Sequence, residues 1–198
     1  MSNKIQQVEG LLVIVSAPSG CGKTTVVDRL LKRHPDWLRS VSATTRSPRT
    51  GEKSGSDYFF LSPGEFEEMR KKGDFLEYAS VHGRSYGTPK PYVTEQYQKG
   101  KTVVLAIDVQ GMRKAKDAVE GSLSLMSIFI LPPSLKVLKQ RLEGRKTETP
   151  TEIEKRMKVA EEEIKQAKLF DHTVINQNVE TTVLEIDELI NKFRKQRR

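Results

Sequence analysis

The sequence predicts an α/β fold: a core with a mainly parallel β-sheet flanked by helices, a small mixed β insertion, and a short lid. Three observations predict it. Short apolar runs alternate with longer segments of helical periodicity, a pattern typical of βαβ units. A glycine-rich turn directly follows the first apolar run. A stretch rich in glycine, serine and arginine then interrupts the alternation over roughly residues 40–90.

The core elements follow from the hydrophobic pattern. Leu11 to Val15 form an apolar run of strand length, and Thr24 to Arg33 carry apolar residues at helical spacing. The remaining core elements are expected as strands at 102–107, 125–131 and 172–175, a short helix through Met112 and Ala115, and a closing amphipathic helix over 179–194.

The stretch 40–88 is predicted to be a small, mostly β insertion, with short strands at 40–45, 58–61 and 75–79. Ser62 and Glu65 have the spacing of a capping box, Pro63 suits the first position of a helix, and Gly73 would end that helix.

A second polar insertion, 143–150, leads into another capping box at Thr149 and Glu152, which begins a helix expected to run to about Phe170. We therefore expect a core of 1–39, 89–140 and 171–198, an insertion of 40–88, and a lid with its following helix at 141–170.

Composition narrows the class of protein. With 198 residues, 36% hydrophobic and 30% charged, the chain is expected to be globular. The single cysteine, Cys21, excludes an internal disulfide and fits a reducing compartment. The longest apolar run is far shorter than the ~20 residues that span a bilayer, and the first residues lack the order of a signal peptide. We expect a cytoplasmic protein without a membrane partner.

The net charge of +8 has two interpretations. Clustered lysine and arginine are typical of nucleic-acid binders. Much of the excess, however, lies at 192–198 and in scattered arginines, so a basic helix end and a site for small polyanions explain the sign equally well. We expect no nucleic-acid polymer as partner, and the sequence is compatible with a monomer or a homodimer.

The glycine-rich turn matches a phosphate-binding loop. Residues 17–24 follow the G-x-x-x-x-G-K-[ST] pattern, with Ala17 in place of the first glycine. In such a loop backbone N–H groups and the following helix N-terminus surround phosphate oxygens. Lys23 would bridge the β- and γ-phosphates, and the Thr24 hydroxyl would hold Mg²⁺. Cys21 is either a small loop filler or a thiol activated by the helix N-terminus. The motif indicates the phosphate donor and leaves the acceptor open.

A second group of residues suits another anion. Arg46 and Arg49 lie three apart and Tyr58 follows, and guanidinium and phenol groups both donate to phosphate oxygens. From these residues alone, a phosphate clamp and a solvated basic loop are equally compatible with the sequence.

A family resemblance narrows this choice. The run from Ser42 to Glu52, with Gly55, Asp57 and Tyr58 after it, is similar to the guanylate kinase signature. The similarity covers nearly the whole chain. It continues through Phe75-Leu76-Glu77-Tyr78, Tyr86-Gly87-Thr88, Ile107-Asp108-Val109-Gln110-Gly111 and Arg141-Leu142-Glu143-Gly144-Arg145.

The resemblance implies a kinase that uses ATP and GMP as small-molecule substrates, with dGMP as an alternative acceptor. Arg46, Arg49, Tyr58 and Tyr86 would hold the GMP phosphate; Ser42, Glu77, Thr88 and Asp108 would read guanine. ATP would lie against Ala17, Pro18, Ser19, Gly20, Cys21, Gly22, Lys23, Thr24 and Thr25, with Arg141, Arg145 and Asn176 beside it. Lys23, Arg46, Arg145 and Arg156 would stabilise the charge that moves during transfer.

The base-reading assignment has a physical reason. Guanine presents two neighbouring donors, N1–H and the 2-amino group, which a carboxylate such as Glu77 can accept. Adenine presents an acceptor instead, and a buried unpaired polar group can reject an analogue by ~10⁴-fold. Asp108 follows a buried strand, where ligand sites of α/β sheets collect. It either reads guanine or supports Mg²⁺ through water.

Several features depart from the family pattern. Ala17 replaces a glycine, Ala106 stands where some members carry a second aspartate, and Asn176-Gln177-Asn178 replaces the usual Asn-Asp-Asp. Three alternatives stay open: a non-catalytic module that binds phosphorylated peptides, a related kinase with another acceptor, and an RNA-binding protein. Lys23 and Thr24 argue against the first alternative and Glu77 with Ser42 against the second, whereas charge alone suggests the third.

Overall fold

The computed structural model describes residues 10–81, 83–144 and 149–197. Its backbone forms two compact units, each described by itself below. The first unit comprises Met1–Leu12, Asp36–Val103 and Gln110–Leu125, and the second comprises Val13–Pro35, Val104–Val109 and Met126–Arg198. The predicted division into core, insertion and lid stays a prediction.

A five-stranded parallel sheet has the strand order β2-β7-β1-β8-β9. Its strands are β1 (Leu11–Ser16), β2 (Leu38–Arg39), β7 (Thr102–Leu105), β8 (Leu125–Leu131) and β9 (His172–Ile175). Residues of β1 and β7 are buried throughout, as expected of parallel strands covered on both faces. The predicted parallel sheet is confirmed. β7 ends at Leu105 rather than at 107, so residues 106–108 are loop.

The predicted helices are present, with one boundary changed. They are α1 (Lys23–Arg33), α4 (Val109–Val119), α6 (Pro150–Lys165) and α7 (Val179–Gln196). A further helix, α5 (Leu135–Glu143), follows β8. The capping box of Thr149 and Glu152 begins α6 as expected. Within the described residues, no helix has both the length and the apolar character needed to cross a bilayer.

The helix α6 was expected to continue to about Phe170, and this boundary was wrong. It ends at Lys165, and a 3₁₀ turn, Ala167–Leu169, follows. Tertiary contacts explain the early end. Phe170 packs on Phe129 with ring centroids 5.0 Å apart, and Asp171 accepts hydrogen bonds from the backbone and hydroxyl of Ser127, both at 2.7 Å. The chain must leave the helix to reach these partners and enter β9.

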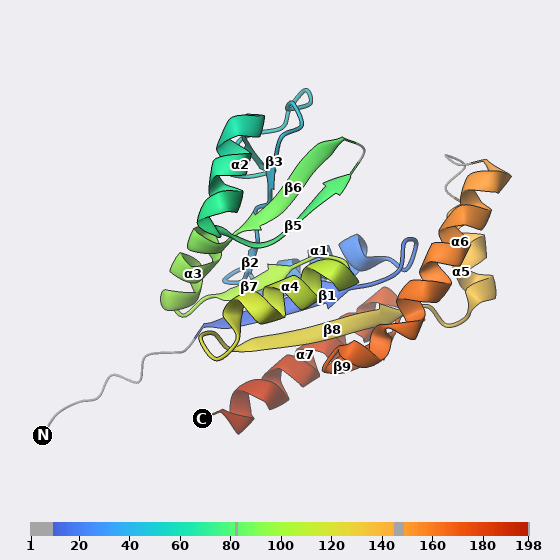
Figure 1. The fold of residues 1–198 in the computed structure, drawn as a ribbon. Helices are drawn as coiled ribbons and strands as arrows, with labels where there is room; N and C mark the ends of the chain where they lie inside the picture. Colours follow the sequence, from blue (N-terminus) through green and yellow to red (C-terminus); the bar gives the residue numbers. More distant parts are fainter. Residues whose placement is uncertain (1–9, 82, 145–148, 198) are drawn as a thin grey trace, which may run out of the picture. The chain divides into compact units, whose positions relative to one another are not determined.

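The predicted β insertion contains a separate four-stranded mixed sheet of order β4-β3-β6-β5. Its strands are β3 (Ala43–Thr44), β4 (Phe59–Phe60), β5 (Phe75–Val81) and β6 (Arg84–Pro89). β3 pairs parallel with β4 and antiparallel with β6. Figure 1 shows β5 and β6 as a hairpin. The helix α2 (Pro63–Lys72) has the predicted capping box at Ser62, and Gly73 ends it at a φ of 73°.

The sequence pattern does not predict β6 or the helix α3 (Lys90–Gln98). β6 has a mostly polar sequence that contains Gly87 and Pro89, so it lacks the alternation of a half-buried strand. α3 buries only Val93 and Tyr97 and has no apolar stripe. Tertiary pairing and packing form both elements.

A buried carboxylate joins α1 to α7. Asp187 on α7 is 7% exposed and accepts a hydrogen bond from Arg33 Nε at 2.6 Å, while its other oxygen contacts His34 Nε2. A buried carboxylate needs such partners because it has lost its water.

We expect Asp187→Ala to lower the free energy of unfolding by about 1–3 kcal/mol, because hydrogen bonds to charged groups contribute this much. Urea unfolding followed by circular dichroism measures the effect. Glu185→Ala, at an exposed position of the same helix, is the matched control and should change stability by less than about 0.5 kcal/mol. Equal midpoints for the two variants would show that the Asp187 cluster does not stabilise the fold.

Candidate active site

The phosphate loop connects β1 to α1 in the second unit, in the strand–loop–helix context that the motif requires. Gly20 and Gly22 have φ angles of 90° and 83°, a region that L side chains rarely adopt. A Cβ atom at Gly20 would also lie 2.8 Å from Leu142 Cδ2. The loop conformation therefore requires glycine at both positions.

Lys23 is held at the end of the loop by backbone oxygens. Its Nζ donates to the carbonyls of Ile107 at 3.2 Å and Ala106 at 3.5 Å. Thr24 and Thr25 follow at the exposed start of α1, whose first turn contains no acidic residue. Backbone N–H groups, the helix N-terminus and an ammonium group thus gather in one place, which suits a polyphosphate.

The helix α6 contacts the loop at Ser19 through two side chains. Arg156 Nη1 donates to Ser19 Oγ at 2.9 Å, and the half-buried carboxylate of Glu163 accepts from the Ser19 backbone N–H. The two side chains lie seven residues apart, so they share one face of the helix. Glu163 is not among the predicted site residues. Its spacing from Arg156 on a predicted helix is the signal that could have identified it.

The charge of Glu163 is held in an unfavourable environment. Burial raises the pKa of this carboxyl above its ordinary value, and the negative charge of nearby Asp108 raises it further. The positive charge of Lys23 and the hydrogen bond from the Ser19 N–H both lower the pKa of Glu163. The structure thus places Asp108 in the second unit, close enough to Glu163 to act on it electrostatically.

Asn176 ties the loop to the helices around it. Its side-chain amide is 2% exposed, donates from Nδ2 to the carbonyl of Cys21 at 2.8 Å, and accepts at Oδ1 from Thr182 at 3.2 Å. The backbone carbonyl oxygen of Asn176 accepts a hydrogen bond from Arg141 Nη2 at 2.9 Å. Hydrogen bonds therefore join Asn176 to Cys21 and Arg141, and all three residues are expected beside ATP. The Asn176 amide is engaged inside the protein, and its direct contact with ATP stays a prediction.

The acceptor residues gather in the first unit, around Arg46. Arg46 makes a two-pronged ion pair with Glu52, with Nη1 and Nη2 each 2.9 Å from a carboxylate oxygen. Its Cζ lies 5.3 Å from the ring centroid of Tyr58, and Tyr86 also hydrogen-bonds it. Tyr58 and Tyr86 meet edge to face, with centroids 6.2 Å apart. The side chain of Arg49 is exposed beside them.

Glu52 accepts hydrogen bonds from both Arg46 and Arg49, although the sequence motif that contains it gave it no role. It accepts from the Arg49 backbone N–H at 2.7 Å in addition to the Arg46 guanidinium. The hydrogen bond from Arg46, and then that from Arg49, holds the pKa of Glu52 below its ordinary value, and Glu52 raises the pKa of Arg46. Both partners therefore stay charged.

The candidate guanine readers lie on paired strands of the same unit. Glu77 on β5 stands opposite Thr88 on β6, and Thr88 Oγ1 donates to Glu77 Oε1 at 2.7 Å. Ser42 lies next to β3, where its carbonyl accepts from the Phe59 backbone N–H. Of the predicted residues, Arg145 lies outside the described residues.

Comparison with known proteins identifies the family of this chain. The family model described as guanylate kinase matches residues 9–193 of the chain. This chain belongs to the guanylate kinase family. The guanylate kinase of Clostridioides difficile (strain 630) is 50% identical over 184 residues, which is 92% of this chain and 88% of that protein.

A second family member, the guanylate kinase of Clostridium perfringens (strain SM101 / Type A), is 45% identical over 192 residues, or 96% of this chain and 87% of that protein. The crystal structure of guanylate kinase from Anaplasma phagocytophilum superimposes with a TM-score of 0.71 at 31% identity. It covers 94% of this chain and 87% of that one. The expected family and the α/β fold are confirmed.

The loop cysteine behaves as a filler in this structure. Cys21 is fully buried, and burial raises the pKa of its thiol to about 12, against a smaller opposing effect of Arg141. At pH 7.5 the reactive thiolate is therefore a minute fraction of the population.

We expect native protein to react with a disulfide reagent such as DTNB at least about 100-fold more slowly than a free cysteine at pH 7.5. The release of thionitrobenzoate measures the rate. Protein unfolded in guanidinium is the internal control and should react fully, because Cys21 is the one cysteine of the sequence. If the native protein reacted as fast as free cysteine, the Cys21 thiol would instead be activated by the helix N-terminus.

Proposed function

We propose that this chain transfers the γ-phosphate of Mg-ATP to GMP or dGMP through the residues described above. As a member of the guanylate kinase family, the chain is an enzyme that phosphorylates GMP with ATP. The observation that supports the assignment of residues is that the cationic side chains fall into two sets, one in each unit. Lys23 with the phosphate loop lies in one unit, and Arg46 with Tyr58 and Tyr86 lies in the other.

On the donor side, the loop amides and Lys23 bind the β- and γ-phosphates of ATP. Arg141, Arg145 and Arg156 neutralise charge on the transferring group. Phosphoryl transfer asks for positioning and charge stabilisation rather than covalent chemistry from the protein. The contacts of α6 with Ser19 keep the loop and Arg156 in a fixed relation, which is the positioning that this mechanism needs.

On the acceptor side, Arg46, Arg49, Tyr58 and Tyr86 bind the phosphate of GMP. One of its oxygens attacks the γ-phosphorus, and the bond from that phosphorus to the β–γ bridging oxygen breaks. The electron pair leaves with ADP, and the products are ADP and GDP. Because the GMP phosphate is already an anion near pH 7, no general base is needed.

Guanine is read by Glu77, Ser42 and Thr88. The Thr88 hydroxyl occupies one lone pair of Glu77 Oε1, which leaves acceptor capacity on the carboxylate for N1–H and the 2-amino group. Asp108 lies in the unit of the phosphate loop. Two roles stay open for it, reading guanine and supporting Mg²⁺ on the donor side.

The donor side also fits the Mg²⁺ that the family implies. Mg²⁺ prefers hard oxygen ligands, and the exposed Thr24 hydroxyl and the Asp108 carboxylate supply them. Burial raises the pKa of the Glu163 carboxyl first and the negative charge of Asp108 second, and a cation beside Asp108 would offset the second effect. When bound, the ion would neutralise charge on the β- and γ-phosphate oxygens.

The proposal extends to partners and location. ATP and GMP are the small-molecule partners, the chain binds neither a nucleic-acid polymer nor a membrane, it is cytoplasmic, and it is either a monomer or a homodimer. The alternatives of a phosphopeptide-binding module, another acceptor and an RNA-binding protein are tested by the acceptor profile.

We expect ADP release from Mg-ATP to require GMP or dGMP, with AMP, CMP, UMP and no acceptor near background. A coupled assay measures it. Lys23→Ala should lower kcat by at least about 100-fold, because it removes the ammonium that bridges the phosphates. Turnover with AMP equal to that with GMP would overturn the roles given to Glu77 and Ser42, and no turnover with any nucleotide would contradict the proposed reaction.

A second prediction concerns Glu52. Because this carboxylate holds Arg46 in place, Glu52→Gln should raise KM for GMP roughly 5- to 20-fold and leave KM for ATP unchanged. Steady-state kinetics with each substrate varied in turn measures both constants. Glu68→Gln, which removes an exposed partner of Lys72 on α2, is the control and should change neither constant. A lower KM for GMP in Glu52→Gln would mean that Glu52 competes with GMP for Arg46.

A further inference from the structure

An aromatic residue between two cations lies directly beside the candidate base reader. Tyr78 follows Glu77 on β5 and is 37% exposed. Lys114 Nζ lies 4.7 Å from its ring centroid and Arg70 Cζ lies 5.9 Å from it. Arg70 also hydrogen-bonds the side chain of Tyr78. All four residues belong to the first unit. Such cation–π contacts hold a ring in position.

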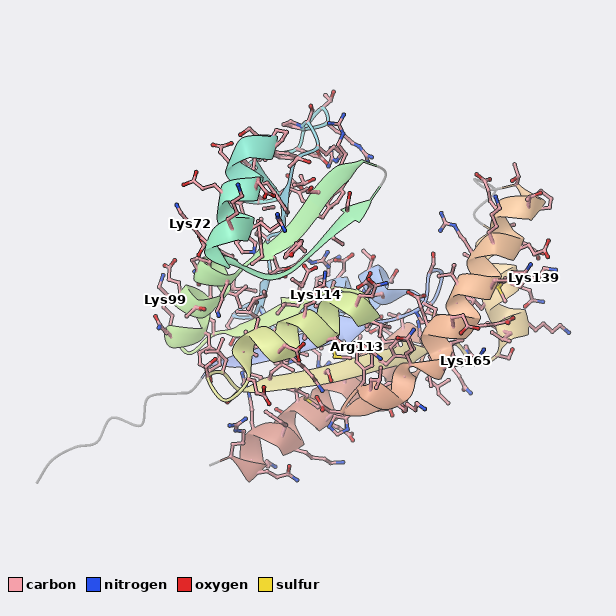
Figure 2. All side chains as sticks on the ribbon, viewed as in Figure 1. Lys72, Lys99, Arg113, Lys114, Lys139 and Lys165 are labelled. Carbon is pink, nitrogen blue, oxygen red and sulfur yellow. The ribbon has the colours of Figure 1, made fainter. Side chains whose placement is uncertain are left out.

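Lys114 holds the backbone of the same residue. From α4, where Figure 2 labels it, its Nζ donates to the carbonyl oxygen of Tyr78 at 2.8 Å. β5 is the edge strand of the four-stranded sheet, so it has a strand partner on one side only. Edge strands have backbone groups that no neighbouring strand satisfies. One ammonium group thus fixes both the ring and the main chain of the residue after Glu77.

The strand pairing next to Glu77 is not regular. The pairing of β5 with β6 is irregular between Phe75 and Glu77, where the register shifts. On the β6 side, Glu77 is held by its pairing with Thr88 and by the Thr88 hydroxyl. A carboxylate that must meet two donors of guanine at once depends on both position and orientation. The restraint of Tyr78 by Lys114, on the side of β5 away from β6, therefore bears on how the Glu77 carboxylate is oriented.

We propose that Lys114 is a positioning residue for guanine recognition, which holds Tyr78 by its carbonyl and its ring and so orients the Glu77 carboxylate. The proposal rests on the proposed function, in which Glu77 reads guanine. Lys114 acts through Glu77 and touches no substrate. Its loss should thus weaken the use of GMP and leave the donor side unchanged.

Lys114→Met keeps the length of the side chain and removes the donor and the charge. We expect kcat/KM for GMP to fall about 3- to 10-fold, the range of one hydrogen bond, with kcat within about twofold and KM for ATP unchanged. Lys114→Arg, which keeps a donor and a cation, should restore most of the loss. Arg113→Met removes a neighbouring exposed charge of α4, labelled in Figure 2, and should have no effect on these constants.

A double-mutant cycle with Glu77→Gln decides whether Lys114 acts through Glu77. We expect Lys114→Met to change kcat/KM for GMP by less than about 1.5-fold in the Glu77→Gln background. The same 3- to 10-fold loss in both backgrounds, or an equal loss in Arg113→Met, would overturn the proposal. Wild-type turnover of GMP and the effect of Glu77→Gln alone test the proposed function separately, so its failure is distinguishable from that of the Lys114 proposal.

Discussion

Much of this structure depends on one kind of interaction, the hydrogen bond from a site cation to a fixed oxygen. Lys23 donates to carbonyls after β7, Arg46 to Glu52, and Arg156 to Ser19. Long cationic side chains lose considerable conformational entropy when they are fixed. Here that loss occurs when the protein folds, which under the proposed residue roles lowers the entropic cost of binding a phosphate.

The oxygens are available because the fold places backbone and carboxylates beside the cations. β7 ends at Leu105, earlier than its apolar pattern predicts, and the carbonyls of the following loop accept from Lys23 instead of continuing a strand. Glu52 belongs to the loop between β3 and β4 and accepts from both Arg46 and the Arg49 backbone. In each unit an irregular segment next to a short strand provides the acceptor, as is common where loops carry function.

The sequence predicts those parts of the molecule that local rules determine. β1, α1 and β8 follow from hydrophobic period, the starts of α2 and α6 from their capping boxes, and the phosphate loop from its glycines. β6 and α3 escape prediction because pairing and packing, not periodicity, form them.

The candidate site divides in the same way. Lys23, Arg46 and Glu77 stand in motifs, and the family resemblance gives their roles. Glu163 carries no motif, and its contact with Ser19 depends on how α6 packs. Asn176 has a motif position, but its buried amide supports Cys21, a role that only tertiary structure reveals.

We have proposed that two separate sets of residues bind the two nucleotides. Titration calorimetry of GMP and of ATP, each alone, on Lys23→Ala and Arg46→Ala tests it most directly. We expect Lys23→Ala to weaken ATP binding at least about 10-fold and to leave GMP binding unchanged. Arg46→Ala should weaken GMP binding by a similar factor and leave ATP binding unchanged. If both variants weakened both nucleotides equally, the division into a donor set and an acceptor set would be contradicted.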